Sequence, residues 1–296
     1  MVPYECLALS VGRASALGAL ALLSSCAAPG AFSALGSAGR RALTGPSLAS
    51  VREQAEAIDF KGRGGWQRLA DDLLSAPLSI WGDVSSLVRS PDNWVVLGGA
   101  AALGGVVQNA DVDLWRYQER GANESDLLPG GMSRFLDGAG DGWVLFSAAS
   151  ALYGYGLVSE NQEHYLAGRT AFASMATSSV LTTALKVLVD AERPNGGRHG
   201  YPSGHTALSM ALASTLQTSY GWEVGLPLYL LSGLVAFQRM DSGAHDIDDV
   251  IVGAAIGYLS ARQVHRSRHF EFLGARVMPF MDPSTATTGL SLTWSF

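Results

Sequence analysis

Residues 186–205 read KVLVDAERPNGGRHGYPSGH, and residues 239–249 read RMDSGAHDIDD. The cationic side chains of the two stretches include Lys186, Arg193 and Arg239. A phosphoryl group in transfer carries negative charge on its equatorial oxygens, and fixed cations stabilise that charge. Arginine can also bind two oxygens of one phosphate at once. The first hypothesis for this part of the chain is therefore a phosphoryl-binding site.

A helix is expected to begin near His205, directly after Ser203 and Gly204. A glycine before a helix N-terminus leaves backbone N–H groups free to hold an anion. Ser203 can donate its hydroxyl to the same anion, or it can simply cap the helix. Residues 203–205 thus add uncharged donors to the expected site.

His245 and Asp249 are four residues apart and would share one face of a helix expected over about 245–264. A carboxylate there can accept the imidazole N–H, which fixes the tautomer and leaves the other ring nitrogen as a nucleophile. His205 could then protonate the leaving oxygen. Each feature alone is more often structural, so the prediction depends on their joint occurrence.

Three acidic residues, Asp246, Asp248 and Asp249, lie beside His245 and offer ligands for a metal ion in principle. The nearby cations would disfavour a metal in the same place, because like charges repel. We therefore expect neither a metal nor another cofactor in this site.

The three motifs are Lys-x6-Arg-Pro at 186–194, Pro-Ser-Gly-His at 202–205 and Arg-x5-His-x3-Asp at 239–249. Together they resemble the signature motifs of the type 2 phosphatidic acid phosphatase superfamily, which includes membrane lipid phosphatases, bacterial class A acid phosphatases and vanadium haloperoxidases. The resemblance implies metal-independent hydrolysis in which His245 takes the phosphoryl group as a phosphohistidine and His205 acts first as acid and then as base. It also implies that Asp249 orients His245, and that the phosphate is bound by Lys186, Arg193, Ser203, Gly204 and Arg239.

The chain departs from the family pattern at Gln238, where the family usually has serine. An amide can still donate a hydrogen bond, so we expect altered phosphate contacts rather than loss of activity. Asp190, Glu192 and Asp241 place negative charge near the cations and are expected to weaken the binding of highly charged substrates.

The fold class expected for the whole chain is all-α, a bundle of about six core helices followed by a short C-terminal β-hairpin. Apolar residues recur at helical spacing in several segments. Helices are expected over 66–88, 92–108, 143–158, 166–189, 205–219, 224–237 and 245–264. Pro77 should break or kink the first of these, and a polar stretch, 109–142, separates the second from the third.

The C-terminal segment alternates apolar and polar residues over 289–296, a period of two that is typical of a strand. A turn signal at 282–284 separates it from the apolar segment 276–281, which predicts a hairpin packed on the bundle. A single hairpin cannot close an outer-membrane barrel. The expected organisation is a helical phosphatase domain at 66–270 and the hairpin at 271–296.

The first residues are typical of a secretory leader: Arg13 precedes an apolar run at 14–23, and small residues follow. Residues 1–26 are therefore expected to be a signal peptide and 27–65 a linker. The sequence before Cys26 also resembles a bacterial lipoprotein signal, whereas an ordinary signal peptide cut nearby is the alternative. Because Cys6 and Cys26 are the only cysteines, the expected folded body contains no disulfide and no cysteine metal site.

The composition of the chain limits the classes of substrate and binding partner that are expected. Charged residues are only 16% of the chain, and the net charge is -6, which argues against nucleic acid. The low charge favours a phosphorylated lipid as substrate, hydrolysed at a phosphate monoester or a pyrophosphate. The protein is expected to be exported to the periplasm of a bacterial cell envelope and to associate with the membrane there. Most charge-free runs are shorter than the about 20 residues that span a bilayer, so a compact bundle and membrane insertion both stay open.

Other functions remain open at this point. They are a soluble periplasmic acid phosphatase acting on small phosphate esters, a vanadium haloperoxidase, and a non-catalytic envelope protein. Vanadate would be an inhibitor of the phosphatases and the cofactor of the haloperoxidase. The oligomeric state is undetermined.

Overall fold

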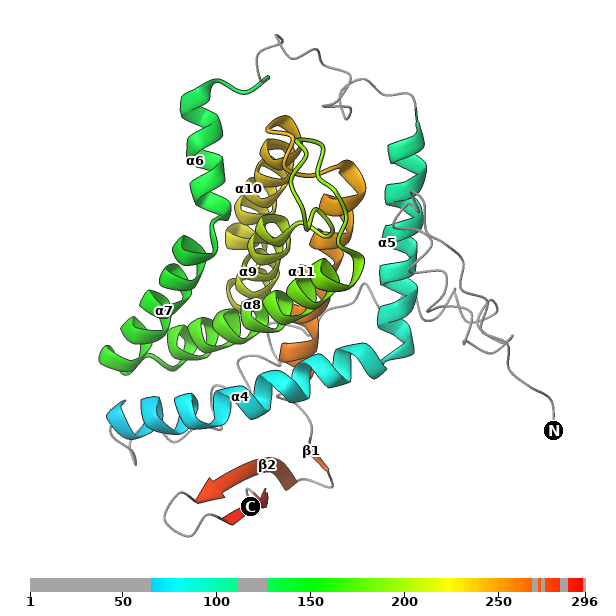
Figure 1. The fold of residues 1–296 in the computed structure, drawn as a ribbon. Coiled ribbons are helices and arrows are strands. Elements are labelled where there is room, and N and C mark those ends of the chain that lie inside the picture. Colours follow the sequence, from blue (N-terminus) through cyan, green and yellow to red (C-terminus); the bar gives the residue numbers. More distant parts are fainter. Residues whose placement is uncertain (1–64, 111–126, 268–270, 273–274, 283–286, 295–296) are drawn as a thin grey trace, which may run out of the picture.

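The computed structural model describes residues 65–110, 127–267, 271–272, 275–282 and 287–294. The expected leader at 1–26 and nearly all of the expected linker lie outside the described residues. In the described ranges the chain forms eight helices, α4 to α11, and three short strands (Figure 1). The all-α prediction is confirmed.

The first two helices are α4 (Gly65–Arg89) and α5 (Pro91–Asn109). Pro77 lies inside α4 and does not end it, contrary to one of the two expected outcomes. Proline at the first position of α5 has no amide hydrogen to leave unsatisfied, which explains why the helix starts there.

Helix α6 (Gly130–Gly140) lies in the polar stretch that the sequence analysis left without a helix. Four of its eleven residues are glycine, so its intrinsic preference for the helix is low. Its Leu136 is buried, and α6 lies along α10 in the bundle, so tertiary packing stabilises it. Asp141 then caps α7 (Gly142–Val158) by accepting a hydrogen bond from the N–H of Trp143 at 2.8 Å.

The remaining helices are α8 (Gln162–Val189), α9 (Gly204–Tyr220), α10 (Trp222–Asp241) and α11 (Ile247–Ser267). Helix α9 is central and contacts α8, α10 and α11 (Figure 1). Many of its buried residues are Ala, Ser or Thr. Small side chains let the helix axes approach closely.

Two glycines set the distance between α11 and α9. A Cβ added at Gly257 would lie 2.2 Å from the carbonyl oxygen of Ala207, and one at Gly253 would lie 2.6 Å from that of Ser203. The N-terminus of α9 is therefore held directly against α11.

The C-terminal strands are β1 (Glu271–Phe272), β2 (Ala275–Asp282) and β3 (Thr287–Trp294), and they pair antiparallel in the order β1-β2-β3. In the β2–β3 register Ala275 is opposite Trp294 and Asp282 is opposite Thr287. The strands lie beside α4 (Figure 1), where the sequence predicted a hairpin.

Apolar surface is prominent in this structure. Of the helices described, α8 alone is long and apolar enough to cross a membrane, by length and composition. Large apolar side chains are also exposed elsewhere, such as Trp66 on α4, Trp143 on α7 and Trp222 on α10.

Candidate active site

The three sequence motifs meet at the end of the bundle that lies away from α4 (Figure 1). Two backbone hydrogen bonds hold the loop between α8 and α9 against the α10–α11 connection. The N–H of Ser203 donates to the carbonyl oxygen of Asp249 at 3.0 Å, and the N–H of Asn195 donates to that of Gly243, also at 3.0 Å. Segments more than forty residues apart in the sequence thus form one site.

His245 and Asp249 are in contact, as the sequence predicted. The Nδ1 atom of His245 lies 3.2 Å from Oδ2 of Asp249. The helix, however, begins at Ile247 and not at His245. His245 lies in the preceding loop, where its N–H donates to the carbonyl oxygen of Arg239 at 3.1 Å. The carboxylate also accepts the N–H of Asp246 at 3.0 Å, which orients it toward the loop.

The surroundings of His245 keep its ring neutral. Its side chain is 3% exposed, and burial together with the charges of Lys186, Arg239 and Arg193 lowers its pKa to about 3. Burial raises the pKa of Asp249. When Nδ1 carries the ring hydrogen and donates it to Asp249, Nε2 has a free lone pair, as a nucleophile requires.

The cations come from the ends of α8 and α10 and from the loop between α8 and α9, which contains Arg193. Lys186, in the last turn of α8, donates from Nζ to the carbonyl oxygen of His199 at 2.8 Å. Burial and the charge of Arg193 lower the pKa of Lys186 to about 8. A Cβ added at Gly204 would be 3.9 Å from Cε of Lys186, so this side chain passes the N-terminus of α9. Arg239 enters from the last turn of α10.

Ser203 fulfils the capping role and keeps a donor. Its fully buried Oγ accepts hydrogen bonds from the N–H of Thr206 at 3.5 Å and from Oγ1 of Thr206 at 3.0 Å. Neither bond uses the hydroxyl hydrogen of Ser203. The two roles considered for this residue are therefore compatible.

His205 lies in the first turn of α9, with its side chain 29% exposed. Burial and the charge of Arg239 lower its pKa to about 4, whereas Asp137 and Asp141 act in the opposite direction. Oδ1 of Asp137 lies 3.8 Å from Nε2 of His205 and also forms an ion pair with Arg239. Sequence reasoning missed Asp137, because no motif marks it within the polar stretch.

Two of the three acidic residues expected to weaken phosphate binding, Asp190 and Asp241, have partners of their own. Asp190, at the end of α8, pairs with Arg198 and, at 3.0 Å, with Nδ1 of His199. The carboxylate of Asp241 accepts the N–H groups of residues 127 and 128 at 2.9 and 3.0 Å. The negative charges of Asp190 and Asp241 are therefore partly compensated by neighbouring hydrogen-bond donors.

Gln238 is turned toward α6. It is buried, and its Nε2 donates to Oγ of Ser133 at 3.2 Å. In the structure this amide connects α10 to α6, and the expectation of altered phosphate contacts stays a prediction.

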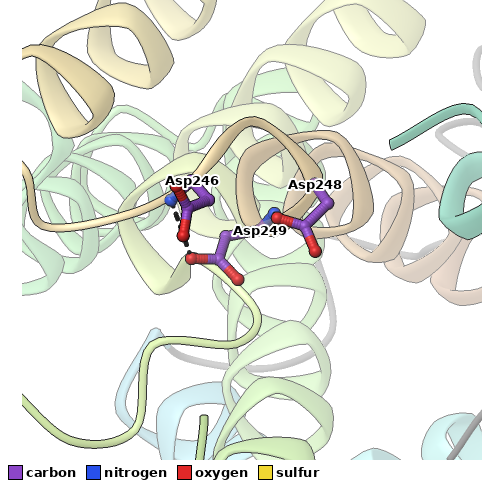
Figure 2. A group of neighbouring side chains, drawn as sticks. All are labelled: Asp246, Asp248 and Asp249. Atoms are coloured by element: carbon purple, nitrogen blue, oxygen red, sulfur yellow. Dashed lines mark hydrogen bonds between the residues drawn. The ribbon is translucent and has the colours of Figure 1, made fainter. Parts of the chain in front are cut away.

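The acidic cluster at the start of α11 is shown in Figure 2. Ligand atoms of Asp246, Asp248 and Asp249 lie within 4.8 Å of one another. Oδ2 of Asp249 is bonded to His245 and to the N–H of Asp246, and Oδ1 of Asp248 accepts the N–H of Asp249 at 3.0 Å. The cluster is accounted for by these bonds within the turn, and the expectation that the site uses no metal stays a prediction.

Comparison with known proteins shows which family part of the chain is similar to. A model of the PAP2 superfamily matches residues 167–272, which contain α9, α10, α11 and most of α8. This match confirms the resemblance found in the motifs. A search of curated proteins found no match.

Two solved structures are similar at low identity. One is the crystal structure of Aquifex aeolicus LpxE, with 20% identity and a TM-score of 0.42, covering 56% of this chain and 93% of that chain. The other is the first transmembrane PAP2 type phosphatidylglycerolphosphate phosphatase from Bacillus subtilis, with 15% identity and a TM-score of 0.40, covering 67% and 98%.

Proposed function

We propose, on the premise that residues 167–272 belong to the PAP2 superfamily, that this protein is a metal-independent phosphatase. One observation carries the proposal. The neutral, buried His245 is oriented by Asp249 and lies under the influence of three cations, Lys186, Arg193 and Arg239. A nucleophile that is surrounded by positive charge suits an anionic electrophile such as a phosphate ester.

In the first half-reaction, the phosphoryl group binds between the cations and the N-terminus of α9, where Gly204 and Ser203 supply donors. Nε2 of His245 attacks phosphorus, and the bond from phosphorus to the leaving oxygen breaks. His205 transfers its proton to that oxygen. The products are a phosphohistidine at His245 and the free alcohol, or a phosphate when the substrate is a pyrophosphate.

In the second half-reaction, water attacks the phosphohistidine. His205, now neutral, takes a proton from that water, and the bond between phosphorus and Nε2 of His245 breaks. Inorganic phosphate leaves, and both histidines return to their starting states. Asp249 holds the His245 ring in one tautomer throughout.

We further propose that the substrate is lipid-linked and that the protein works at a lipid surface of the bacterial envelope. The exposed apolar side chains of α4, α7 and α10 support this substrate class, since apolar surface of this extent favours contact with lipid. The apolar helix α8 supports it as well.

The test is phosphate release by the purified protein from phosphatidate, phosphatidylglycerol phosphate, undecaprenyl pyrophosphate and p-nitrophenyl phosphate. Each substrate is assayed with EDTA, with and without vanadate, beside the His245→Ala variant. We expect release that persists in EDTA, is inhibited by vanadate and is absent from the variant. Faster turnover of the lipids than of p-nitrophenyl phosphate is the expected ranking.

Three outcomes would contradict parts of this proposal. Equal activity of the His245→Ala variant would remove the phosphohistidine mechanism. Loss of activity in EDTA would show a metal-dependent enzyme. Turnover of p-nitrophenyl phosphate alone would indicate a soluble-substrate phosphatase.

A further inference from the structure

Asp137 on α6 faces two groups of the proposed site at once. Its carboxylate forms an ion pair with Arg239, whose side chain is only 12% exposed. The same Oδ1 atom lies 3.8 Å from Nε2 of His205. The residue thus lies between the phosphate-binding arginine and the proposed general acid.

The position of Asp137 is set by the packing of α6 on α10. At one end, the N–H groups of residues 127 and 128 donate to Asp241, and further along, Gln238 donates to Ser133. At the other end, a Cβ on Gly140 would lie 2.5 Å from Val235 Cγ1 and 3.2 Å from His205 Cδ2, so only glycine allows this approach. Contacts at both ends of the helix therefore hold Asp137 against the site.

For Arg239 the ion pair fixes a rigid group. The guanidinium is planar, so holding Nη1 restricts the direction of all its donors. Nε of Arg239 is buried and makes no hydrogen bond within the described part of the chain. While Nη1 is paired with Asp137, Nε therefore remains as a donor for an incoming phosphoryl oxygen.

For His205 the carboxylate is a counter-charge. The groups facing this ring are Arg239 and His245, which disfavour its protonated form, and Asp137 and Asp141, which favour it. Asp141 also accepts the N–H of Trp143 as the cap of α7. Asp137, by contrast, has an oxygen near the ring nitrogen itself.

We propose that Asp137 is a positioning residue of this site, which orients the guanidinium of Arg239 and supplies the counter-charge for His205 when that ring carries its proton. The inference rests on the proposed phosphatase function and goes beyond it, because Asp137 lies outside the region matched by the family.

The test compares Asp137→Asn and Asp137→Glu with the wild-type protein on two substrates. Phosphatidate has an alkoxide leaving group that needs a proton, whereas the p-nitrophenolate ion leaves without one. For Asp137→Asn we expect kcat on phosphatidate to fall by about tenfold to a hundredfold, which is at or below the lower end of what general acid catalysis contributes, because His205 itself is still present. On p-nitrophenyl phosphate the fall should be smaller, with a raised KM on both substrates from the freed arginine.

The pH profile is the second readout. Without the carboxylate, His205 loses its proton at lower pH, so the basic limb of kcat on phosphatidate should shift to lower pH in Asp137→Asn. Asp137→Glu keeps the charge and should restore most of the rate and the wild-type limb. Ser133→Ala is the matched control, since it removes a contact of α6 with α10 without changing any charge near Arg239.

Unchanged kinetics and pH profile in Asp137→Asn would overturn the inference while leaving the phosphatase in place. Equal losses in Ser133→Ala, or equal losses on the two substrates with no pH shift, would also overturn it, because the effect would then come from docking of α6. Absence of phosphate release by the wild-type protein would overturn the proposed function and this inference together.

Discussion

His245 and His205 have different environments and are expected to titrate differently once substrate binds. Burial and neighbouring cations lower the pKa of His245 to about 3 and that of His205 to about 4 in the free protein. The nucleophile is therefore neutral across the physiological range. The general acid, by contrast, depends on help from negative charge, which an incoming phosphate brings.

A pH dependence follows from these pKa values. The nucleophile must be unprotonated, so activity rises as the pH increases through about 3, and the acid must be protonated, so kcat/KM falls above about 4. A bound phosphate raises the pKa of His205, because negative charge favours the imidazolium. We expect the basic limb of kcat to lie at higher pH than that of kcat/KM, measured on phosphatidate. Coincident limbs would contradict this assignment of His205.

Asp249 is the second residue whose role can be measured alone. In Asp249→Asn the amide would no longer enforce the tautomer of His245, and kcat should fall by about 10³- to 10⁴-fold with little change in KM. Asp248→Asn is the control, since Asp248 lies in the same cluster and has no bond to His245 among the described contacts. Equal losses in the two variants would point to general damage to the turn.

At the scale of elements, the site depends on how closely α11 approaches α9. Gly253 and Gly257 allow backbone contact along this interface, which holds Ser203 beside Asp249. The periodicity of the sequence predicted both helices but assigned His245 to the second one. Helical spacing did not predict the turn at Gly243, where φ is 66°, and this turn precedes His245.

Gly257→Ala tests this interface. The added Cβ would meet the carbonyl oxygen of Ala207 at 2.2 Å, so we expect the protein to lose about 1–3 kcal/mol of stability. Thermal unfolding should show a lower Tm, together with reduced phosphatase activity. Gly98→Ala on α5 is the control, because its Cβ would meet nothing within 4 Å. There alanine should be neutral or stabilising, by up to about 1 kcal/mol. A similar Tm for both variants would show that the interface adapts.

At the scale of the whole molecule, α4 is amphipathic in an unusual sense. Two of its charged residues, Arg68 and Asp83, are buried, although Asp71 and Arg89 are exposed, and Trp66 and Trp81 are 84% and 67% exposed. An exposed apolar face bearing tryptophan is typical of helices that lie at a membrane interface. This arrangement agrees with the proposed work at a lipid surface.

Vesicle binding checks that proposal. The full chain carrying Cys26→Ser, so that no lipid anchor contributes, should sediment with phosphatidylglycerol and phosphatidylethanolamine vesicles. Adding Trp66→Ser and Trp81→Ser should reduce the bound fraction by about tenfold or more, from the lost apolar burial. Adding Ser79→Ala instead, on the same helix, should change little. Equal binding of both variants would show that α4 does not contact the lipid.

The sequence alone was sufficient for the helical class and for the resemblance to the family whose model matches residues 167–272. It also supplied most of the residues of the proposed site, whose roles stay predictions. The site residues could be chosen in this way because each motif is short. Residue type and spacing within a motif are enough to single out Lys186, His205 and His245. Tertiary structure alone decided the place of α6 and hence the role proposed for Asp137. A short, glycine-rich helix has little preference of its own, and its ion pair with Arg239 joins residues about a hundred positions apart. Such a contact depends on packing, which no local pattern records.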